Sequence, residues 1–311
     1  MLIIGGTRYI GRHICLASLA AGAEVTLFNR GRTPADWLQA HPTVRRVLGD
    51  RNDRAALAQA FDRRYDAVYD LVVSRAEHVR PLLTEHAAHI GQLVVCSTTS
   101  VYAPALYQPI DEAHPRGPHP AWSKQGKNDA EDLLATAELP ATVLRPQWVF
   151  GAHDYQGLAA FYLQRLAAGL PIWLPHPGIA QLNWTYAPDL AQAFLLVTGH
   201  PAAIGRAFNV VCSETLTGMD FIRLCGQLLG VVPDIRRYRR ADLPPELASQ
   251  RNGTLRDLPL ACTAESIRAT CGFRPTPMPA ALLQTADWLR ATGALAAPEL
   301  TAVERHLQAR A

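Results

Sequence analysis

The stretch Leu2-Ile3-Ile4-Gly5-Gly6-Thr7-Arg8-Tyr9-Ile10-Gly11 opens the chain and decides its fold. Three apolar residues typical of a buried strand run directly into glycines, and a helical pattern begins near Ile10. The glycines let the backbone turn sharply and approach a pyrophosphate, which the N–H groups at the start of a helix attract. Because the pattern begins a strand–helix–strand unit, it predicts a dinucleotide-binding loop over residues 5–11. The alternative is a glycine turn that serves packing alone.

Short apolar runs alternate with amphipathic stretches through the first half of the chain. This alternation predicts an α/β fold with a Rossmann-like, doubly wound parallel sheet. We expect strands at 2–4, 24–28, 44–48, 67–73, 92–97 and 141–145, and helices at 10–21, 34–40, 53–61, 77–89 and 123–136. Right-handed crossovers bring the carboxyl ends of such strands to one edge, where ligands bind. The residues expected at that edge are Gly5, Asn29, Asp50, Val73 and Ser97.

The second half mixes helices with short strands, which predicts a smaller mixed α/β lobe. Its helices are expected at 157–168, 188–198, 218–229, 263–270 and 280–291, and the tail after 296 is either a polar helix or disordered. We therefore expect a dinucleotide-binding domain over residues 1–150, to which segments of 180–215 return. Residues 151–311 then form mainly the substrate-binding lobe.

Composition describes an ordinary globular protein of 311 residues, 49% hydrophobic and 18% charged. A net charge of +3 is too small to favour nucleic acid or a membrane as a partner. The six cysteines form no Cys-x-x-Cys pair and read as buried thiols in a reducing compartment. Met1 leads directly into the first strand, and no apolar run reaches 18 residues. We expect a cytoplasmic protein.

The end of the second strand indicates which dinucleotide binds. An NAD site usually has a carboxylate there for the ribose 2′-hydroxyl, but this strand ends Leu27-Phe28-Asn29-Arg30-Gly31-Arg32. Arg30 and Arg8 of the glycine loop can reach one point, and two guanidinium groups suit a 2′-phosphate. The pattern favours NADP; the alternative is a pair of solvated arginines.

The third strand is followed by Gly49-Asp50-Arg51, a polar turn placed where an adenine would lie. Asp50 is expected either to accept a hydrogen bond from the adenine amino group or to be the N-cap of a helix that begins near Asn52. We count Asp50 and Arg51, with Asn29, among the cofactor-binding residues.

Several segments spread over nearly the whole chain resemble the extended and atypical short-chain dehydrogenases/reductases, of the NAD-dependent epimerase/dehydratase type. The glycine loop, with Asn29-Arg30-Gly31, looks most like a subgroup that contains chloroplast stem-loop RNA-binding proteins and their bacterial relatives. The other similar segments are 96–102 (CSTTSVY), 111–112 (DE), 144–151 (LRPQWVFG), 184–191 (WTYAPDLA), 207–210 (AFNV) and 271–275 (CGFRP).

The resemblance implies a serine or threonine, a tyrosine and a lysine as catalytic residues. Thr98, beside Ser97, takes the hydroxyl position, and Lys127 takes the lysine position, with Glu131 one turn later. Four residues before Lys127, where the family has tyrosine, the sequence has Ser123. A phenol has an unperturbed pKa of about 10, and a serine hydroxyl is a far poorer acid. Ser123 is left to relay a proton through water or to donate a hydrogen bond.

Substitute acids occur in loops expected near the same edge of the sheet, and each can equally be a structural or surface residue. They are Tyr102, Tyr107, His119, His153 and Tyr155.

Together these features predict an NADP-dependent oxidoreductase, or an epimerase/dehydratase-type enzyme, that moves a hydride to or from a carbonyl or hydroxyl carbon of a small molecule. Thr98 would orient the substrate oxygen and Lys127 would order the nicotinamide ribose. The alternative is an inactive NADP-binding sensor or an RNA-associated protein, for which the arginine run at 236–240 is a candidate contact. No histidine set suggests a metal. We expect a monomer or a homodimer, because relatives dimerise through the helices at 77–89 and 123–136.

Overall fold

The chain divides into two compact units, seen here in a computed structural model that describes residues 1–122, 124–250, 252–253, 255 and 258–310. The first unit comprises Met1–Gln147, Thr185–Val211 and Cys262–Pro275. The second comprises Trp148–Trp184, Cys212–Ala261 and Thr276–Ala311.

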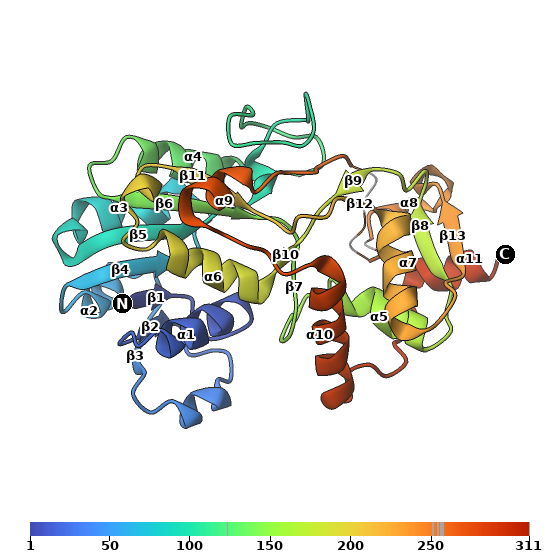
Figure 1. The fold of residues 1–311 in the computed structure, drawn as a ribbon, viewed down its shortest axis with the longest axis horizontal. Helices are drawn as coiled ribbons and strands as arrows, with labels where there is room; N and C mark the ends of the chain where they lie inside the picture. Colours follow the sequence, from blue (N-terminus) through green and yellow to red (C-terminus); the bar gives the residue numbers. More distant parts are fainter. Residues whose placement is uncertain (123, 251, 254, 256–257, 311) are drawn as a thin grey trace. The chain divides into compact units, whose positions relative to one another are not determined.

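A parallel sheet of seven strands forms the centre of the first unit, in the order β11-β6-β5-β4-β1-β2-β3 (Figure 1). The predicted doubly wound sheet is therefore confirmed. The direction of winding reverses between β1 and β4, so a crevice for a ligand is expected at the carboxyl ends of these two strands. The strands are β1 (Leu2–Ile4), β2 (Thr26–Asn29), β3 (Arg45–Leu48), β4 (Tyr65–Asp70), β5 (Ile90–Cys96), β6 (Ala141–Pro146) and β11 (Ala207–Val210).

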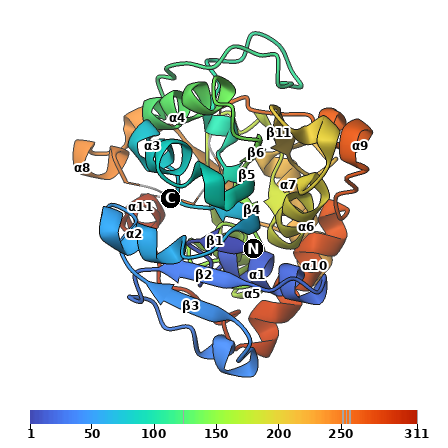
Figure 2. The ribbon, with the colours of Figure 1, turned by 90° about the vertical axis from the view of Figure 1, so that its left-hand side faces the viewer.

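Helices cover both faces of this sheet, as Figure 2 shows. On one face α1 (Ile10–Ala20) packs against α6 (Ala187–Val197). On the other lie α2 (Arg54–Ala60), α3 (Ala76–Thr84) and α4 (Gln125–Ala135), whose apolar residues join those of the strands in one buried core. Because both faces are covered, the strands are apolar along nearly their whole length. The short helix α9 (Glu265–Cys271) also belongs to this unit.

Two helices differ from the prediction. The segment predicted as a helix at 34–40 is a 3-10 turn, Asp36–Ala40. The helix predicted over 77–89 ends at Thr84, and a separate 3-10 turn covers Ala87–His89. Pro81 lies inside α3 and lacks an N–H, which weakens the helix at this point. Beyond the end of α3 the His86 ring stacks on Phe61 at 4.4 Å.

Among the residues that the structure describes, the second unit contains two short pairs of strands and four helices longer than one turn. β8 (Ile172–Pro175) pairs with β13 (Ile235–Tyr238) in parallel, and β9 (Gln181–Leu182) pairs with β12 (Leu216–Thr217) in antiparallel fashion. The helices are α5 (Ala160–Ala167), α7 (Gly218–Leu229), α10 (Met278–Ala291) and α11 (Ala302–Gln308). The tail is thus a polar helix, and Thr301 and Glu304 form a capping box at its start.

Within the parts of the chain that the structure describes, no helix is both long and apolar enough to span a bilayer. Five of the six cysteines are buried and Cys271 is partly exposed, and all six are free thiols.

Candidate functional site

The glycine loop between β1 and α1 has a geometry that only glycine supports. Gly5 has a φ of +94°, and a Cβ on it would lie 2.7 Å from a methyl group of Val72. A Cβ on Gly11 would lie 2.6 Å from the carbonyl oxygen of Gly5. The indole of Trp37 donates to the carbonyl of Thr7 at 3.0 Å and so holds the loop from outside. This close-packed backbone turn, directly before an 11-residue helix, fits a pyrophosphate.

The loops after β2 and β3 face each other beside the glycine loop. Asn29 accepts a hydrogen bond from the Gly31 N–H at 2.9 Å, which forms a tight turn and exposes Arg30. Hydrogen bonds from Asn52 lower the pKa of Asp50, and the charges of Arg30 and Arg32 act in the same direction. Arg30 and Arg32, at the end of β2, therefore lie near enough to Asp50 for their charges to act on it.

Asp50 does not cap the helix that follows it. The N-cap of α2 is Asp53, whose carboxylate accepts from the N–H groups of Ala55 and Ala56. The prediction that Asp50 is a helix N-cap is therefore wrong, because its carboxylate accepts hydrogen bonds from the backbone and side-chain N–H groups of Asn52 instead.

Arg51 is nearly buried and braces this loop against the sheet. Its guanidinium group forms an ion pair with Asp70 at 2.6 Å and donates to the carbonyl of His78, also at 2.6 Å. Asp70 is fully buried at the end of β4. The structure thus places Arg51 at the predicted edge of the sheet with its charge already paired.

Thr98 and Lys127 both lie at the carboxyl end of β5. Thr98 begins a 3-10 turn, accepts from the Ser100 N–H at 3.2 Å and is partly exposed. Lys127, on α4, donates from Nζ to the carbonyl of Cys96 at 3.1 Å. Burial lowers the pKa of Lys127. Ser123, the third predicted catalytic residue, lies outside the described residues.

A buried network of polar side chains lies beneath this turn. Ser97 donates to Glu131, and Arg145 forms an ion pair with Glu131 at 2.5 Å. Arg145 also donates to the hydroxyl of Tyr102 at 2.9 Å, and that hydroxyl donates to Asn209 at 2.7 Å. The network therefore links α4, β6 and β11 behind Thr98. The partner of Glu131, Arg145, was not predicted from the sequence, although a charged residue inside an otherwise apolar strand is the signal that could have found it.

The structure gives each of the three substitute acids of the first unit a structural partner or buries it. Tyr102 is fully buried, and burial raises its pKa, so it is not suited to give a proton to a substrate. Tyr107 donates to Asp111 at 2.8 Å. His119 stacks on Trp122 at a ring distance of 3.8 Å, and burial lowers its pKa. The other two, at 153 and 155, belong to the second unit.

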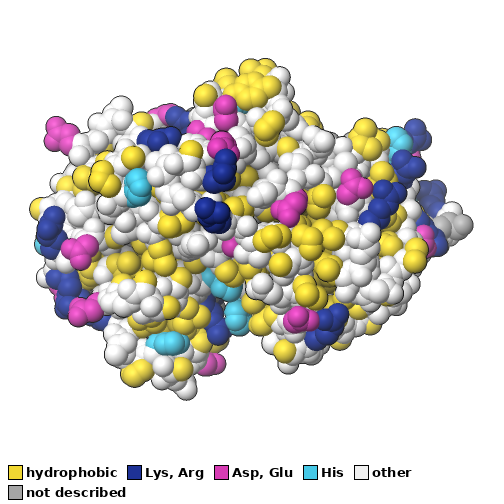
Figure 3. Space-filling view, viewed as in Figure 1, with side chains coloured by type: hydrophobic (Ala, Val, Ile, Leu, Met, Phe, Trp, Pro, Cys, Tyr) yellow, Lys and Arg dark blue, Asp and Glu magenta, His cyan; other side chains and the backbone are white. Residues whose placement is uncertain are grey.

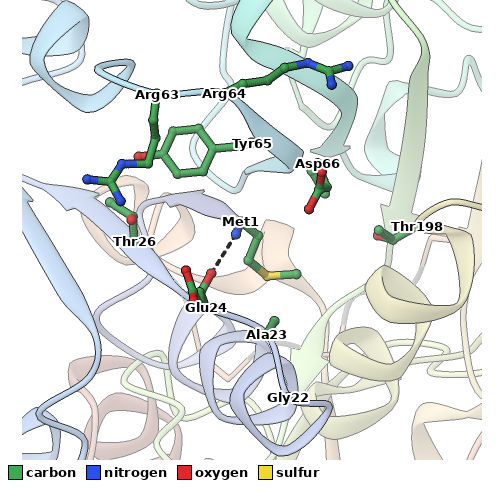
Figure 4. Close-up of a pocket in the computed structure, with 11 residues that line it drawn as sticks. Met1, Gly22, Ala23, Glu24, Thr26, Arg63, Arg64, Tyr65, Asp66 and Thr198 are labelled. Atoms are coloured by element: carbon green, nitrogen blue, oxygen red, sulfur yellow. Dashed lines mark hydrogen bonds between the residues drawn. The ribbon is translucent and has the colours of Figure 1, made fainter.

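A separate cavity of about 350 Å³ lies at the opposite edge of the sheet (Figure 4). It is lined by the amino ends of β1, β2 and β4, and the amino group of Met1 donates to the carbonyl of Glu24 there at 2.6 Å. It contains none of the predicted site residues, so we place the candidate site at the carboxyl edge.

The glycine loop lies at the start of α1, where the winding of the parallel sheet reverses, and a threonine and a lysine lie at the end of β5. This combination is typical of a dinucleotide-binding protein of the oxidoreductase type. The sequence model of the NAD dependent epimerase/dehydratase family matches residues 1–211. The chain belongs to this family.

Relatives within and around this family differ in what their names describe. The chain is 28% identical over 290 residues to the chloroplast stem-loop binding protein of 41 kDa b of Arabidopsis thaliana, covering 88% of this chain and 75% of the relative. A Streptomyces antibioticus protein named probable dTDP-4,6-dihydroxy-2-methyloxan-3-one 4-ketoreductase is 33% identical over 130 residues, 42% of this chain and 41% of that protein. The structure of dTDP-glucose 4,6-dehydratase from Bacillus anthracis in complex with NAD superposes with a TM-score of 0.78 at 19% identity, covering 94% and 97% of the two chains. This last likeness shows the fold.

Proposed function

We propose that the chain is an NADP-dependent oxidoreductase that transfers a hydride to or from a carbonyl or hydroxyl carbon of a small molecule. The observation that carries the proposal is the shared position of Thr98 and Lys127 at the end of β5, in the same sheet edge as the glycine loop. The residues from 151 onward would supply most of the substrate-binding lobe.

The preference for NADP rests on the charges around the end of β2. Arg8 and Arg30 are exposed, and Asp50 in the facing loop is hydrogen-bonded to Asn52. An unesterified ribose 2′-hydroxyl would find no carboxylate at the end of β2 itself, whereas a 2′-phosphate would meet guanidinium groups.

Each residue at the end of β5 has a separate task in this proposal. The nicotinamide, when bound, supplies or accepts the hydride. Thr98 donates a hydrogen bond to the substrate oxygen and so polarises the carbonyl, while Ser97 ties the turn to Glu131 from below. Lys127 binds the nicotinamide ribose from the floor of the site, because its bond to the Cys96 carbonyl fixes the position of its ammonium group. We retain Ser123 as a hydrogen-bond donor.

The test is a fluorescence titration with NADPH and with NADH on the wild type and on the variants Arg30→Ala and Arg8→Ala. We expect both substitutions to weaken NADPH binding by about tenfold or more, the loss of one charge-assisted pair, and to change NADH binding little. Arg64→Ala is the matched control, since Arg64 is an exposed arginine at the opposite edge of the sheet (Figure 4). If the wild type binds neither nucleotide, the proposal is wrong.

A second candidate is an RNA-associated protein that keeps the nucleotide site, favoured by the name of the Arabidopsis relative. Its contact would be the arginine run along β13, but Arg236 pairs with Asp234 and Arg239 with Asp242. On the face that Figure 3 shows, basic side chains are interspersed with acidic and apolar ones. RNA binding through these arginines would fall steeply with rising salt, so a stem-loop titration at two salt concentrations separates the candidates.

A further inference from the structure

Lysine is nearly absent from this chain, and its placement is informative. Of the 30 basic residues, Lys124 and Lys127 are the two lysines, and all the others are arginines. Both occur at the start of α4, three residues apart, in the helix that borders the candidate site. Arginine stays protonated at any physiological pH, whereas a buried lysine can release its proton. The chain therefore uses lysine in place of arginine only here.

The surroundings of Lys127 are built so that its proton is held weakly. Its side chain is partly buried, and the titratable groups that act on it are Lys124 and Glu131 on α4, Asp70 on β4 and the Cys96 thiol on β5. Burial lowers the pKa of Lys127 and the Lys124 charge adds to this effect, while the other three groups oppose it.

Both carboxylates that face Lys127 are already neutralised by arginines. Asp70 is paired with Arg51 at 2.6 Å, and Glu131 is paired with Arg145 at 2.5 Å. All four side chains are buried or nearly so. A carboxylate whose charge is shared with a guanidinium group stabilises a second cation less. The pairing of both carboxylates with arginines acts in the same direction as burial, which is the largest influence on the pKa of Lys127.

We propose that Lys127 supplies the proton that the substrate oxygen takes up, in place of the phenol that position 123 lacks. This inference rests on the proposed function. One N–H of the ammonium group is bonded to the Cys96 carbonyl, and the described residues take neither of the other two. Those two N–H groups are available to the ribose and to the substrate.

The step balances for a ketone reduced by a reduced nicotinamide. The carbonyl carbon receives the hydride, and the C=O π electrons move to oxygen. An N–H bond of Lys127 breaks as the new O–H bond forms, and its electron pair stays on nitrogen as the lone pair of a neutral amine. The amine then regains a proton from solvent. In the oxidation direction, the neutral amine accepts the proton of the alcohol.

The scarcity of lysine makes a direct measurement possible. In the variant Lys124→Arg, Lys127 is the sole lysine, so protein labelled with 13C-lysine gives one Cε resonance to follow against pH. We expect this resonance to titrate at lower pH than that of N-acetyl-lysine amide in the same buffer, both with and without NADP⁺. A midpoint equal to or above that of the reference compound overturns the proposal.

A second variant tests the cause. Arg51→Met, added to Lys124→Arg, leaves Asp70 without its cation, so the Lys127 midpoint is expected to move to higher pH. Arg54→Met is the matched control, because Arg54 is an exposed arginine on α2 paired with Glu85. A midpoint that moves equally in both variants, or in neither, overturns the role of the paired carboxylates. Circular dichroism establishes that each variant is folded.

Activity measurements on Lys127→Arg complete the test and distinguish failure of the inference from failure of the proposed function. With a carbonyl substrate, Lys127→Arg keeps the positive charge and is expected to retain NADPH binding within a few-fold while hydride transfer is lost. Full turnover by Lys127→Arg overturns the inference and leaves the oxidoreductase standing. Failure of the wild type to bind NADPH overturns the oxidoreductase, and the inference with it, whatever the lysine titration shows.

Discussion

Replacing Arg145 by methionine tests whether the network beneath Thr98 holds the site together. The guanidinium group of Arg145 makes three hydrogen bonds to Glu131 and one to Tyr102. Both charged side chains are 4% exposed, so water cannot replace the lost partner. Breaking a buried ion pair by removing one member costs about 3–5 kcal/mol. At about 2–4 °C per kcal/mol for a unit of this size, we expect a fall in melting temperature of roughly 6–20 °C.

The matched control is Arg116→Met. Arg116 lies 3.4 Å from the same Glu131 oxygen and also pairs with Asp132, but its side chain is 25% exposed. Its loss is expected to cost about 1 kcal/mol or less. The double variant Arg145→Met/Glu131→Leu removes both buried charges and should recover most of the loss, because an apolar pair of similar volume is often as stable.

Thermal unfolding followed by circular dichroism measures all three variants. The reasoning is refuted if Arg145→Met melts within about 2 °C of Arg116→Met, or if the double variant is less stable than Arg145→Met. Either result would mean that an unpaired Glu131 carboxylate is not costly in this core.

Three further predictions concern the glycine loop, the second unit and the thiols. Gly11→Ala is expected to weaken NADPH binding by at least about tenfold, because its Cβ would lie 2.6 Å from a backbone oxygen. In the control Gly117→Ala the nearest atom to the new Cβ is 3.9 Å away, so its NADPH titration should match that of the wild type. Burial alone would raise the pKa of Glu304, but hydrogen bonds from Arg165 and Thr301 outweigh burial and lower this pKa. The ionised Glu304 therefore stabilises the fold above about pH 4.3, and this stabilisation is lost as the pH falls toward the pKa of the folded state. Stability should consequently fall less steeply with acid in Glu304→Gln than in the wild type. Ellman's reagent should modify Cys271 in the native protein and the other five thiols only after unfolding. Burial shields these five thiols and raises their pKa, that of Cys212 to about 12. Reaction of more than one thiol in the native protein would contradict this.

Local pattern was enough to predict the sheet and the loop at its edge. Leu2–Ile4 is short and buried throughout, and Ile90–Cys96 is buried except at Gly91. A helix separates each such run from the next, so the alternation itself implies parallel strands. The glycine loop was predicted for the same reason, because the requirement for glycine at 5 and 11 is set by neighbours within the motif and by one adjacent strand.

The pairing of buried charges was beyond local pattern. Arg51 and Asp70 are 19 residues apart, and Glu131 and Arg145 are 14 apart, with a turn or a helix between the partners in each case. Whether two such residues meet depends on which strands are neighbours and which face each side chain occupies. The end of α3 was mispredicted for a similar reason, since the stacking of His86 on Phe61 involves a residue from α2's carboxyl end.

These buried pairs bear on the choice between an enzyme and an inactive relative. Ion pairs as buried as Arg51–Asp70 and Arg145–Glu131 are weak devices for stability, because apolar residues of similar volume often serve as well. Asp70 and Glu131 both raise the pKa of Lys127. Each is paired with an arginine, which weakens the pull of a carboxylate on a second cation. A scaffold that only binds a nucleotide needs a cation at this position but has no need to make that cation easy to deprotonate. In the proposed oxidoreductase, this arrangement suits a site in which a proton moves.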